Sequence, residues 1–258
     1  MKVATWNVNS IKARLPLVLA WLRQVEPDVV LFQETKVPDG EFPVGEIGDL
    51  GYNIAAAGQK TYNGVAVISK RPIDLLAACL PGDPDDREAR YIEAFTGGVR
   101  VASIYAPNGN PVGGERFPYK LAWLRRLYRH MAAALEDEDA AVFAGDYNVA
   151  PTDGDVYDPR AWRDDALCQP ASRAGYRRLL HLGYLDAVRA LSDRDHQYTW
   201  WDYRRRCWPA DRGLRIDHML LSPQAADALT AVGIDREPRG WERASDHTPV
   251  WCELAVSD

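Results

Sequence analysis

The chain has 258 residues, 47% of them hydrophobic, and its 31 Lys and Arg are outnumbered by 37 Asp and Glu, which gives a formal net charge of −6. This length and composition allow a sizeable core without disulfides or structural metals, and they exclude a disordered or low-complexity protein. No apolar run approaches the roughly 18 residues that a membrane helix needs, and the polar N-terminus argues against a signal peptide. We expect ordinary thiols, no zinc site and a cytoplasmic protein from the four widely spaced cysteines, Cys79, Cys168, Cys207 and Cys252.

The start of the chain predicts a strand, a helix and a second strand. Apolar and polar residues alternate over residues 2–8, as in a half-buried strand. Ser10 is a suitable helix cap, and the apolar residues after it recur at helical spacing as far as residue 25. Pro27 stops this helix, and residues 28–34 form a buried strand that ends in polar residues.

Short strands dominate the middle of the chain before a long helix appears. Strands are predicted at residues 52–57, 64–69, 91–95 and 99–105. The Gly97 and Gly98 pair between the last two is typical of a hairpin. A helix is predicted at residues 116–135, followed by a buried strand at 140–144 that we expect to break at Gly145.

The rest of the chain repeats this mixture of helices and strands. Helices are predicted near residues 174–182, 185–191 and 223–229, and strands near 198, 216–221 and 248–254. No linker-like run or short repeat divides the chain. Strands with long helices in each half favour a four-layered α/β sandwich, in which two mixed β-sheets pack face to face with the helices outside. We therefore expect a single domain spanning residues 1–258.

Positive charge is concentrated in one segment, although the whole chain is acidic. Residues 173–215 contain ten Arg, no Lys and five Asp, so this segment carries a local charge of +5. Phosphate binding by proteins depends on such local Lys and Arg groups rather than on net charge. The segment fits either a basic face for a polyanionic substrate or an ordinary solvated Arg-rich surface.

Polar side chains follow several predicted strands where those strands end. They are Asn7, Asn9, Glu34, Tyr105, Asn108, Asp146, Asn148, Asp217 and His247. The ends of neighbouring strands line one rim of a layered β protein, so these distant segments can deliver carboxylates, amides and one imidazole to a single pocket.

The carboxylates and amides suit hydrolysis of a phosphodiester assisted by a hard divalent cation. Mg²⁺ binds through one or two carboxylates and other oxygens while keeping waters, so Glu34 with the Asn7 amide is a candidate holder. The attacking water needs a base in line with the phosphorus, and Asp146 is the best candidate.

The remaining candidates would face the phosphate. His247 can donate a hydrogen bond to the developing negative charge if a carboxylate behind the ring holds it, and Asp217 can supply that carboxylate. Tyr105 adds a neutral donor.

Each of these side chains taken alone also fits a structural role. Asn7 and Asn9 can form turns and cap the first helix, Glu34 can be a rim carboxylate, Asp146 can form a turn, and Asp217 can pair with Arg215 or Arg212. The other histidines, His130, His181, His196 and His218, are assigned to surface or core because no carboxylate cluster surrounds them in the sequence.

Six ordered motifs carry a resemblance to a known family. They are residues 5–9 (TWNVN), 31–36 (LFQETK), 105–109 (YAPNG), 145–151 (GDYNVAP), 212–217 (RGLRID) and 245–247 (SDH). With these motifs, the chain resembles the exonuclease III family of the endonuclease, exonuclease and phosphatase superfamily, whose fold is deoxyribonuclease I-like. The resemblance extends from residue 2 to about residue 254.

The resemblance implies the same site roles as the residue types do. It places Glu34 and Asn7 at a Mg²⁺ ion, for which Mn²⁺ could substitute. It also implies that Asp146 aligns the attacking water. Asn148 and Tyr105 would contact the phosphate, with His247 backed by Asp217. Asp246 would belong to a second metal position, but Asn9 stands where some relatives carry Asp, so the number of metals stays open.

The resemblance also implies a DNA substrate, which the superfamily alone does not, because its members cut different phosphate esters. The DNA-binding candidates are Arg90, Asn108, Lys120, Trp200, Trp201, Arg204 and Leu214. In the family, apolar residues of the Trp-rich segment line a pocket for an abasic sugar, and Trp201 stands where a Phe is common; the alternative is a core Trp pair beside a solvated Arg run.

The function implied is a DNA repair nuclease that cleaves 5′ to abasic sites and trims 3′ ends of duplex DNA as a monomer. The rivals are a superfamily phosphatase acting on small or lipid phosphates and a DNA-binding module without activity.

Overall fold

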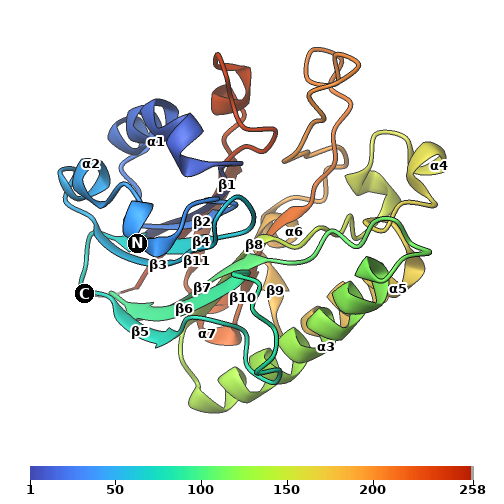
Figure 1. Ribbon diagram of the computed structural model, residues 1–258. Coiled ribbons are helices and arrows are strands. Elements are labelled where there is room, and N and C mark those ends of the chain that lie inside the picture. Colours follow the sequence, from blue (N-terminus) through green and yellow to red (C-terminus); the bar gives the residue numbers. More distant parts are fainter. Residues whose placement is uncertain (257–258) are drawn as a thin grey trace.

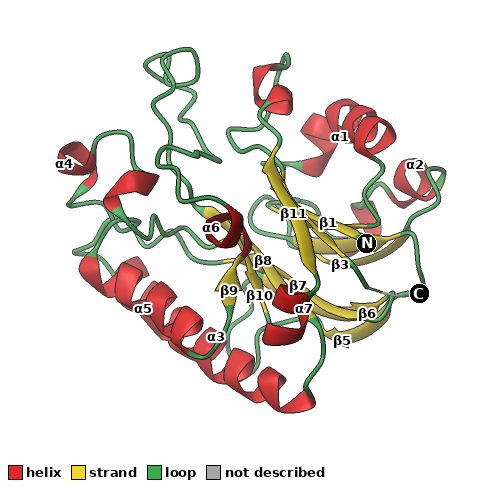
Figure 2. Ribbon diagram, turned by 180° about the vertical axis from the view of Figure 1, so that it is seen from behind, coloured by secondary structure: helices red, strands yellow, loops and turns green. Residues whose placement is uncertain are grey.

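Two six-stranded sheets pack face to face in the computed structural model, which describes residues 1–256 (Figure 1, Figure 2). The first sheet has the strand order β11 (Leu229–Ile234), β12 (Val250–Leu254), β1 (Lys2–Asn7), β2 (Val29–Gln33), β4 (Val65–Ser69), β3 (Asn53–Ala57). The second has the order β5 (Asp74–Ala77), β6 (Tyr91–Thr96), β7 (Val99–Tyr105), β8 (Ala141–Asp146), β10 (Asp217–Leu221), β9 (Leu185–Asp186).

Helices cover the outer face of each sheet, which confirms the predicted four-layered sandwich. The helices are α1 (Ile11–Val25), α2 (Val44–Gly48), α3 (Arg116–Ala134), α4 (Pro159–Trp162), α5 (Pro170–His181), α6 (Ala187–Leu191) and α7 (Pro223–Asp227). Figure 1 shows α1 and α2 outside the first sheet and α3 and α5 outside the second. Among the described residues, no helix is long and apolar enough to span a bilayer.

Alternation along the strands builds three apolar layers. Val3, Leu31 and Val101 belong to the cluster between the two sheets. The opposite face of the first sheet packs on α1, where the Trp6 and Trp21 rings meet edge to face with centroids 5.5 Å apart. The second sheet packs on α3 and α5 in the same way. The layers follow from period-2 burial on strands and 3.6-residue burial on helices.

The predicted start of the chain is confirmed. Ser10 caps α1 by accepting a hydrogen bond from the Ala13 N–H, and the chain returns to place β2 parallel to β1. In this pairing Asn7 lies opposite Gln33, so the polar residues after both strands reach the same edge. The parallel pair β7 and β8 likewise sets Tyr105 opposite Asp146.

Strand β8 corrects one boundary. The predicted break at Gly145 is wrong, because the strand continues through Gly145 to Asp146. Gly145 has a φ of 154°, and a Cβ there would lie 1.9 Å from the Ile104 carbonyl oxygen on β7. The glycine therefore permits close strand contact rather than ending the strand. The Gly97 and Gly98 hairpin is confirmed, with φ values of 55° and 77° between β6 and β7.

Four segments differ from the predictions. The strand predicted near residue 198 is absent from the described structure, where Trp200 makes only isolated bridges to Leu214 and His247. The helix predicted over residues 185–191 begins only at Ala187, because residues 185–186 form the edge strand β9. Strands β5 and β11 have no counterpart among the predictions. Both are edge strands with half-exposed residues, so pairing with a neighbour defines them more than an alternating pattern does.

A buried charge network lies beneath the loops that follow β8 and precede β10. Arg215 is 1% exposed and donates to the carboxylates of Asp155 and Asp186, at 2.7 Å each. The His218 ring lies 3.1 Å from the same guanidinium through Nδ1 and donates through Nε2 to the Val149 carbonyl at 2.8 Å. His218 is a core residue as predicted, but it does have carboxylate neighbours, since Asp186 lies 3.8 Å away.

This network predicts a pH-dependent stability. Burial, together with the Arg215 charge, lowers the pKa of His218 to about 4. Between about pH 6.5 and 4 the unfolded chain binds a proton that the folded ring excludes, so this contribution to stability is present above pH 6.5 and lost as pH falls. From pH 7 to pH 5 the wild type should lose about 2 kcal/mol more than His218→Gln, whose amide does not titrate. Urea midpoints at both pH values measure this, and equal losses would contradict it.

Candidate active site

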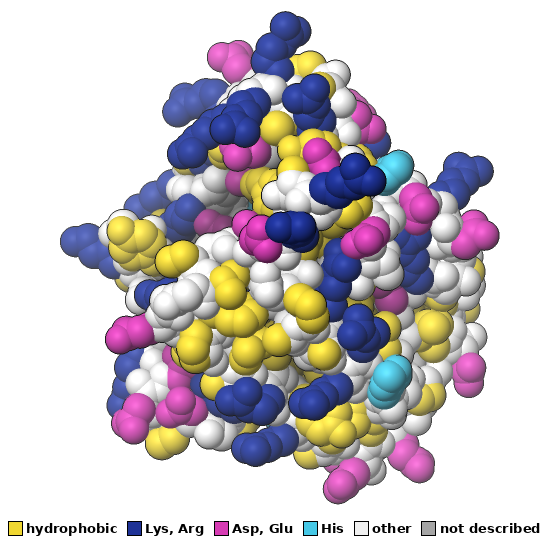
Figure 3. Space-filling view, turned by 90° about the vertical axis from the view of Figure 1, so that its right-hand side faces the viewer, with side chains coloured by type: hydrophobic (Ala, Val, Ile, Leu, Met, Phe, Trp, Pro, Cys, Tyr) yellow, Lys and Arg dark blue, Asp and Glu magenta, His cyan; other side chains and the backbone are white. Residues whose placement is uncertain are grey.

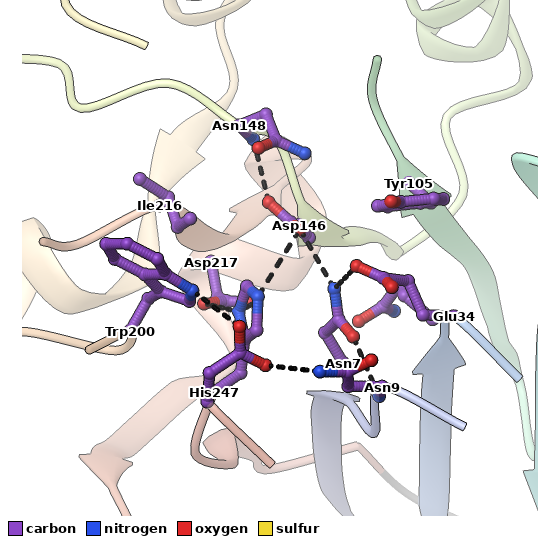
Figure 4. A network of polar contacts seen from close by, with 12 residues as sticks. Asn7, Asn9, Glu34, Tyr105, Asp146, Asn148, Trp200, Ile216, Asp217 and His247 are labelled. Carbon is purple, nitrogen blue, oxygen red and sulfur yellow. Dashed lines mark hydrogen bonds and ion pairs between the residues drawn. The ribbon is translucent and has the colours of Figure 1, made fainter. Parts of the chain in front are cut away.

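Two carboxylates and one imidazole from distant segments meet at one rim of the sandwich. One ligand atom from each of Glu34, Asp146 and His247 lies within 4.8 Å of the others. Figure 4 shows them facing one another, with Asn7 between the two carboxylates. Glu34 follows β2 of the first sheet, whereas Asp146 ends β8 of the second. The predicted convergence of strand ends is therefore observed.

Unusual backbone conformations aim these residues. Asn9, Glu34 and Asn148 have positive φ values of 45°, 51° and 49°. Such left-handed conformations cost about 1–2 kcal/mol for non-glycine residues, and surrounding contacts must maintain them. At Glu34 the carbonyl accepts a 2.7 Å hydrogen bond from the Ser10 N–H, at the start of α1. This hydrogen bond connects the Ser10 cap of α1 to the loop that carries Glu34 and stabilises both.

The amide of Asn7 joins the two carboxylates. Its Nδ2 donates to Glu34 Oε1 at 2.9 Å and to Asp146 Oδ2 at 3.0 Å. Burial raises the pKa of Asp146 to about 7, with His247 opposing this rise and the nearby carboxylates of Asp217 and Glu34 adding to it. The Asp146 carboxylate is therefore more basic than that of an ordinary aspartate, as a general base near neutral pH requires.

Asp217 holds the imidazole of His247. Its Oδ2 lies 2.9 Å from His247 Nδ1 and also accepts a 2.6 Å hydrogen bond from the Thr199 hydroxyl. The other ring nitrogen, Nε2, lies 3.7 Å from Asp146 Oδ2. Burial lowers the pKa of His247, but the carboxylates of Asp217 and Asp146 outweigh it and hold this pKa above its usual value. The ring is thus a protonated donor at neutral pH.

The structural alternative for Asp217 fails. Arg215 directs its Nε and Nη1 to the carboxylates of Asp155 and Asp186 instead. Asp217 is 1% exposed, and its recorded partners are Thr199 and His247.

Tyr105 and Asn148 complete the polar wall. Burial, followed by the Glu34 charge, raises the pKa of Tyr105 well above its ordinary value, so the phenol is a neutral donor. Asn148 uses its main-chain N–H to hold Asp146 Oδ1 at 2.9 Å, and its Oδ1 accepts from Asn108 Nδ2 at 3.0 Å. These contacts make one continuous hydrogen-bonded wall from Asn108 to Asp146.

Arg90 supports Tyr105 from behind in this structure. It is 8% exposed, its guanidinium lies 4.6 Å from the Tyr105 ring centroid, and Glu88 pairs with its Nε at 2.6 Å. A phosphate would reach this cation only by displacing those partners, so the contacts favour positioning of Tyr105.

A double-mutant cycle tests this role. We expect Arg90→Met and Tyr105→Phe each to lower kcat by roughly tenfold or more. The double variant should have a kcat no lower than that of the less active single variant, because both substitutions affect the same hydrogen bond from the Tyr105 hydroxyl to the phosphate. The salt dependence of DNA binding should not change in Arg90→Met. Additive losses or a shallower salt slope would instead identify Arg90 as a phosphate contact, and Arg90→Lys shows whether charge alone suffices.

The metal candidates do not all present oxygen toward one point. Glu34 lies 2.8 Å from the Lys36 ammonium through Oε2. Burial raises the pKa of Glu34, but Lys36, the Asn7 amide and the His247 charge together keep it below its usual value. Asn7 Oδ1 accepts from the Asn9 N–H at 3.0 Å. The carboxylates of Glu34 and Asp146 are therefore the oxygen donors best placed for a hard cation, and this donor set fits Mg²⁺.

Asp246 lies apart from that pair. Its Oδ2 accepts from Trp200 Nε1 and its Oδ1 from Asn9 Nδ2, both at 3.0 Å. These two contacts orient the Trp200 ring and tie Asp246 to the loop that carries Asn9.

A pocket with one polar and one apolar wall opens beside these residues. A cavity of about 300 Å³ is bordered by Tyr105 and Asn148 on its polar side and by Trp162, Leu167, Trp200 and Ile216. Trp162 and Trp200 meet edge to face with centroids 5.8 Å apart. Trp200 thus lies where the sequence predicted an apolar pocket residue.

Three predicted DNA contacts are not at the surface. Trp201 is fully buried beside Trp208 and donates to Asp211, so it does not act as a wedge in the pocket. Leu214 is fully buried in the cluster behind Trp200. Lys120 is also fully buried, and its Nζ donates to the main-chain oxygens of Asn108 and Asn148 at 3.0 and 2.5 Å. Burial lowers the pKa of Lys120 to about 7.

Part of the positive charge of the Arg-rich segment, residues 173–215, is neutralised by ion pairs in the structure. Arg173 and Arg189 pair with Asp153 and Asp155, acids that precede the segment. Arg204 and Asn108 are exposed near the cleft, as a DNA contact requires. In Figure 1 the orange loop around residues 200–213 and the red segment around 237–247 rise above the same edge of the sheets.

Sequence reasoning missed several site residues. Thr199 holds Asp217, Lys36 neutralises Glu34, and Trp162 and Ile216 line the pocket. Lys36 and Ile216 lie inside recognised motifs, two residues from Glu34 and one from Asp217, and that proximity was the available signal. Nothing local distinguishes Thr199, or Trp162 at the end of α4, from residues outside the site.

A layered α/β fold with this cluster at its rim defines a phosphodiester hydrolase. The family model described as Endonuclease/Exonuclease/phosphatase family matches residues 4–247, and the chain belongs to this family. Exodeoxyribonuclease III of Haemophilus influenzae is 32% identical, over 98% of this chain and all of that protein. Within the family, this chain is a nuclease of the exodeoxyribonuclease III and AP endonuclease type.

Two solved structures show the same likeness. An AP endonuclease from Archaeoglobus fulgidus is 35% identical with a TM-score of 0.95, covering 99% of this chain and 100% of that one. The D146N form of the 3′ phosphatase NExo from Neisseria, bound to a product DNA hairpin, is 40% identical with a TM-score of 0.96, covering 98% and 99%. The deoxyribonuclease I-like fold is confirmed.

Proposed function

We propose that this nuclease uses Mg²⁺ to hydrolyse the phosphodiester on the 5′ side of abasic sites in duplex DNA, and that it removes nucleotides or blocking groups from 3′ ends. The observation that carries the proposal is a pocket that Glu34 of the catalytic cluster lines on one side and that has an apolar wall formed by Trp162, Leu167, Trp200 and Ile216. Residues of both sheets form this one site, which supports a single domain over residues 1–258. The four free cysteines support a reducing, cytoplasmic location.

The side chains divide the work of hydrolysis. Asp146 accepts a proton from the attacking water, whose oxygen forms a bond to phosphorus while the bond from phosphorus to the 3′ oxygen breaks. The departing 3′ oxygen takes a proton from a solvent water and becomes the 3′-hydroxyl. The protonated His247, held by Asp217, donates to the phosphoryl oxygen on which negative charge develops. Tyr105 and Asn148 add neutral donors on the other side.

Glu34, with Asp146 nearby, would hold the Mg²⁺ ion, and the ion would neutralise charge on the phosphate. The Lys36 ammonium occupies one Glu34 oxygen in the structure. We expect it to stay close to the site as a second positive charge, since the Asn9 side chain also accepts its hydrogen bond at 2.5 Å.

The pocket explains how damage is selected. A nucleotide without a base loses stacking and pairing, so extruding it from the duplex costs up to a few kcal/mol less. A cavity of about 300 Å³ with Trp162 and Trp200 in its wall has room for a deoxyribose. In this proposal the two rigid rings, rather than the cavity volume, exclude an intact nucleotide. The relatives named as AP endonuclease and as 3′ phosphatase support both halves of the proposed activity.

The test uses three matched duplexes with purified protein. One contains a single tetrahydrofuran site, one carries a 3′-phosphate, and one has an unmodified recessed 3′ end. We expect incision of the first, dephosphorylation of the second and slower shortening of the third, all stopped by EDTA and restored by excess Mg²⁺. Extension of the incised strand by a polymerase confirms its 3′-hydroxyl, and no incision at the tetrahydrofuran site would refute abasic-site cleavage.

One finer alternative has support of its own. The relative bound to a product hairpin is named a 3′ phosphatase, so this chain could favour 3′-phosphate ends over internal abasic sites. The ratio of kcat/KM on the first two duplexes decides between these activities. Activity on an inositol phosphate alone would favour the small-phosphate rival.

A further inference from the structure

A groove between α3 and α5 lies on the outer helical layer, away from the catalytic cleft. It has a volume of about 310 Å³ and an apolar floor formed by Leu121, Leu124, Ala171, Ala174 and Gly175. None of its lining residues borders the catalytic cavity. The floor is set by close helix contact, since a Cβ at Gly175 would lie 3.0 Å from Leu124 Cδ1.

Exposed cations line this groove without acidic partners. Arg125 and Arg178 form its rim with Tyr128, which is 37% exposed. Arg129 and Arg177 are exposed on the same two helices. Within residues 1–256, none of these four arginines forms an ion pair, although Arg126 and Arg173 on the same two helices each do. Figure 3 faces this side and shows hydrophobic side chains between dark blue ones in its lower half.

We propose that this groove docks an acidic amphipathic helix of a partner protein. A groove between two packed helices accepts the ridge of a third helix, and the small side chains Ala171, Ala174 and Gly175 allow close approach. Apolar residues on one face of the partner helix would cover the floor. Asp and Glu beside them would pair with Arg125 and Arg178, giving charge complementarity at the rim.

A protein helix fits this surface better than duplex DNA does. DNA is held through its phosphates and would leave the apolar floor uncovered or only wetted. The arginines here also flank a narrow concave floor rather than forming the broad basic face that a duplex needs. The groove shares no residue with the proposed catalytic site, so it can be tested separately from the nuclease activity.

Fluorescence anisotropy with a labelled 12-residue peptide provides the test. The peptide carries Leu at every third or fourth position and Glu or Asp elsewhere, and two control peptides replace either the acids by Lys or the leucines by Ser. We expect the wild type to bind only the first peptide. Arg178→Glu should weaken this binding by about tenfold or more, since it places repulsion at the rim. Ala171→Trp, which fills the groove from an exposed position, should weaken it similarly.

Arg23→Glu is the matched control, because Arg23 is exposed on α1 and its reversal changes the net charge equally. It should leave peptide affinity unchanged, and all three variants should keep wild-type nuclease activity and melting temperature. Failure of the acidic peptide to bind, or binding unaffected by both groove variants, would refute the proposal. A loss of duplex DNA affinity in Arg178→Glu but not in Arg23→Glu would assign the groove to DNA instead, and a dimer that Arg178→Glu dissociates would assign it to a second copy.

Discussion

Asp146→Asn should abolish turnover on the abasic duplex while leaving DNA affinity within about twofold of the wild type. The amide keeps the shape of the side chain and can still contact the Asn148 N–H and His247. It cannot accept a proton from water, because an amide oxygen is far less basic than a carboxylate. A loss of roughly 10⁴-fold or more in kcat is expected when the base is removed from a site whose members act together.

Single-turnover incision and anisotropy on the same duplex separate chemistry from binding. Asp153→Asn is the matched control, because Asp153 is an exposed carboxylate paired with Arg173 outside the cluster. Its activity should equal that of the wild type. Substantial turnover by Asp146→Asn would show that another group is the base, whereas lost DNA affinity would indicate that the substitution disturbs the rim.

Glu34→Gln should raise the Mg²⁺ concentration needed for half-maximal activity by roughly a hundredfold, because the substitution removes the negative charge best placed to hold the cation. The amide can still accept from Asn7, so the loop should keep its conformation. Calorimetric titration with Mn²⁺ measures the metal affinity directly, without relying on turnover.

Glu46→Gln, an exposed change on α2, is the matched control for charge and should bind Mn²⁺ as the wild type does. The melting temperature in EDTA adds a second readout. Glu34→Gln should lose less stability on metal removal than the wild type, because stabilisation by a ligand scales with its affinity for the folded state. Unchanged Mn²⁺ affinity in Glu34→Gln would mean that other residues hold the metal.

The central strands and long helices were predictable because their burial pattern is local. Residues 28–34 and 99–105 are continuous or alternating apolar runs, and the helix after residue 116 repeats its apolar positions at helical spacing. Polar residues directly after such strands must lie at a sheet edge. For that reason, the sequence alone predicts that Glu34 and Asp146 lie at the same rim.

The edge strands and the loop residues were not predictable in this way. β5 and β11 lack a buried face of their own, and pairing with a neighbour creates them. The two neighbouring tryptophans show the same limit, since Trp200 faces the cavity and Trp201 faces the core with no local difference in sequence. In an irregular loop, side-chain direction depends on contacts with residues far along the chain.

The amino-acid sequence was therefore enough to establish the layered architecture, the ordered motifs and the residue types at the rim. The periodic spacing of apolar residues and the polar residues that follow each strand are visible within short stretches of sequence. Only the tertiary structure shows which partners the buried cations have. Arg90 lies over the Tyr105 ring, and Lys120 donates to the carbonyls of Asn108 and Asn148. Arg215 forms ion pairs with Asp155 and Asp186. A buried charge needs a partner wherever the packed chain provides one, and that partner lies 12 to 60 residues away in these cases.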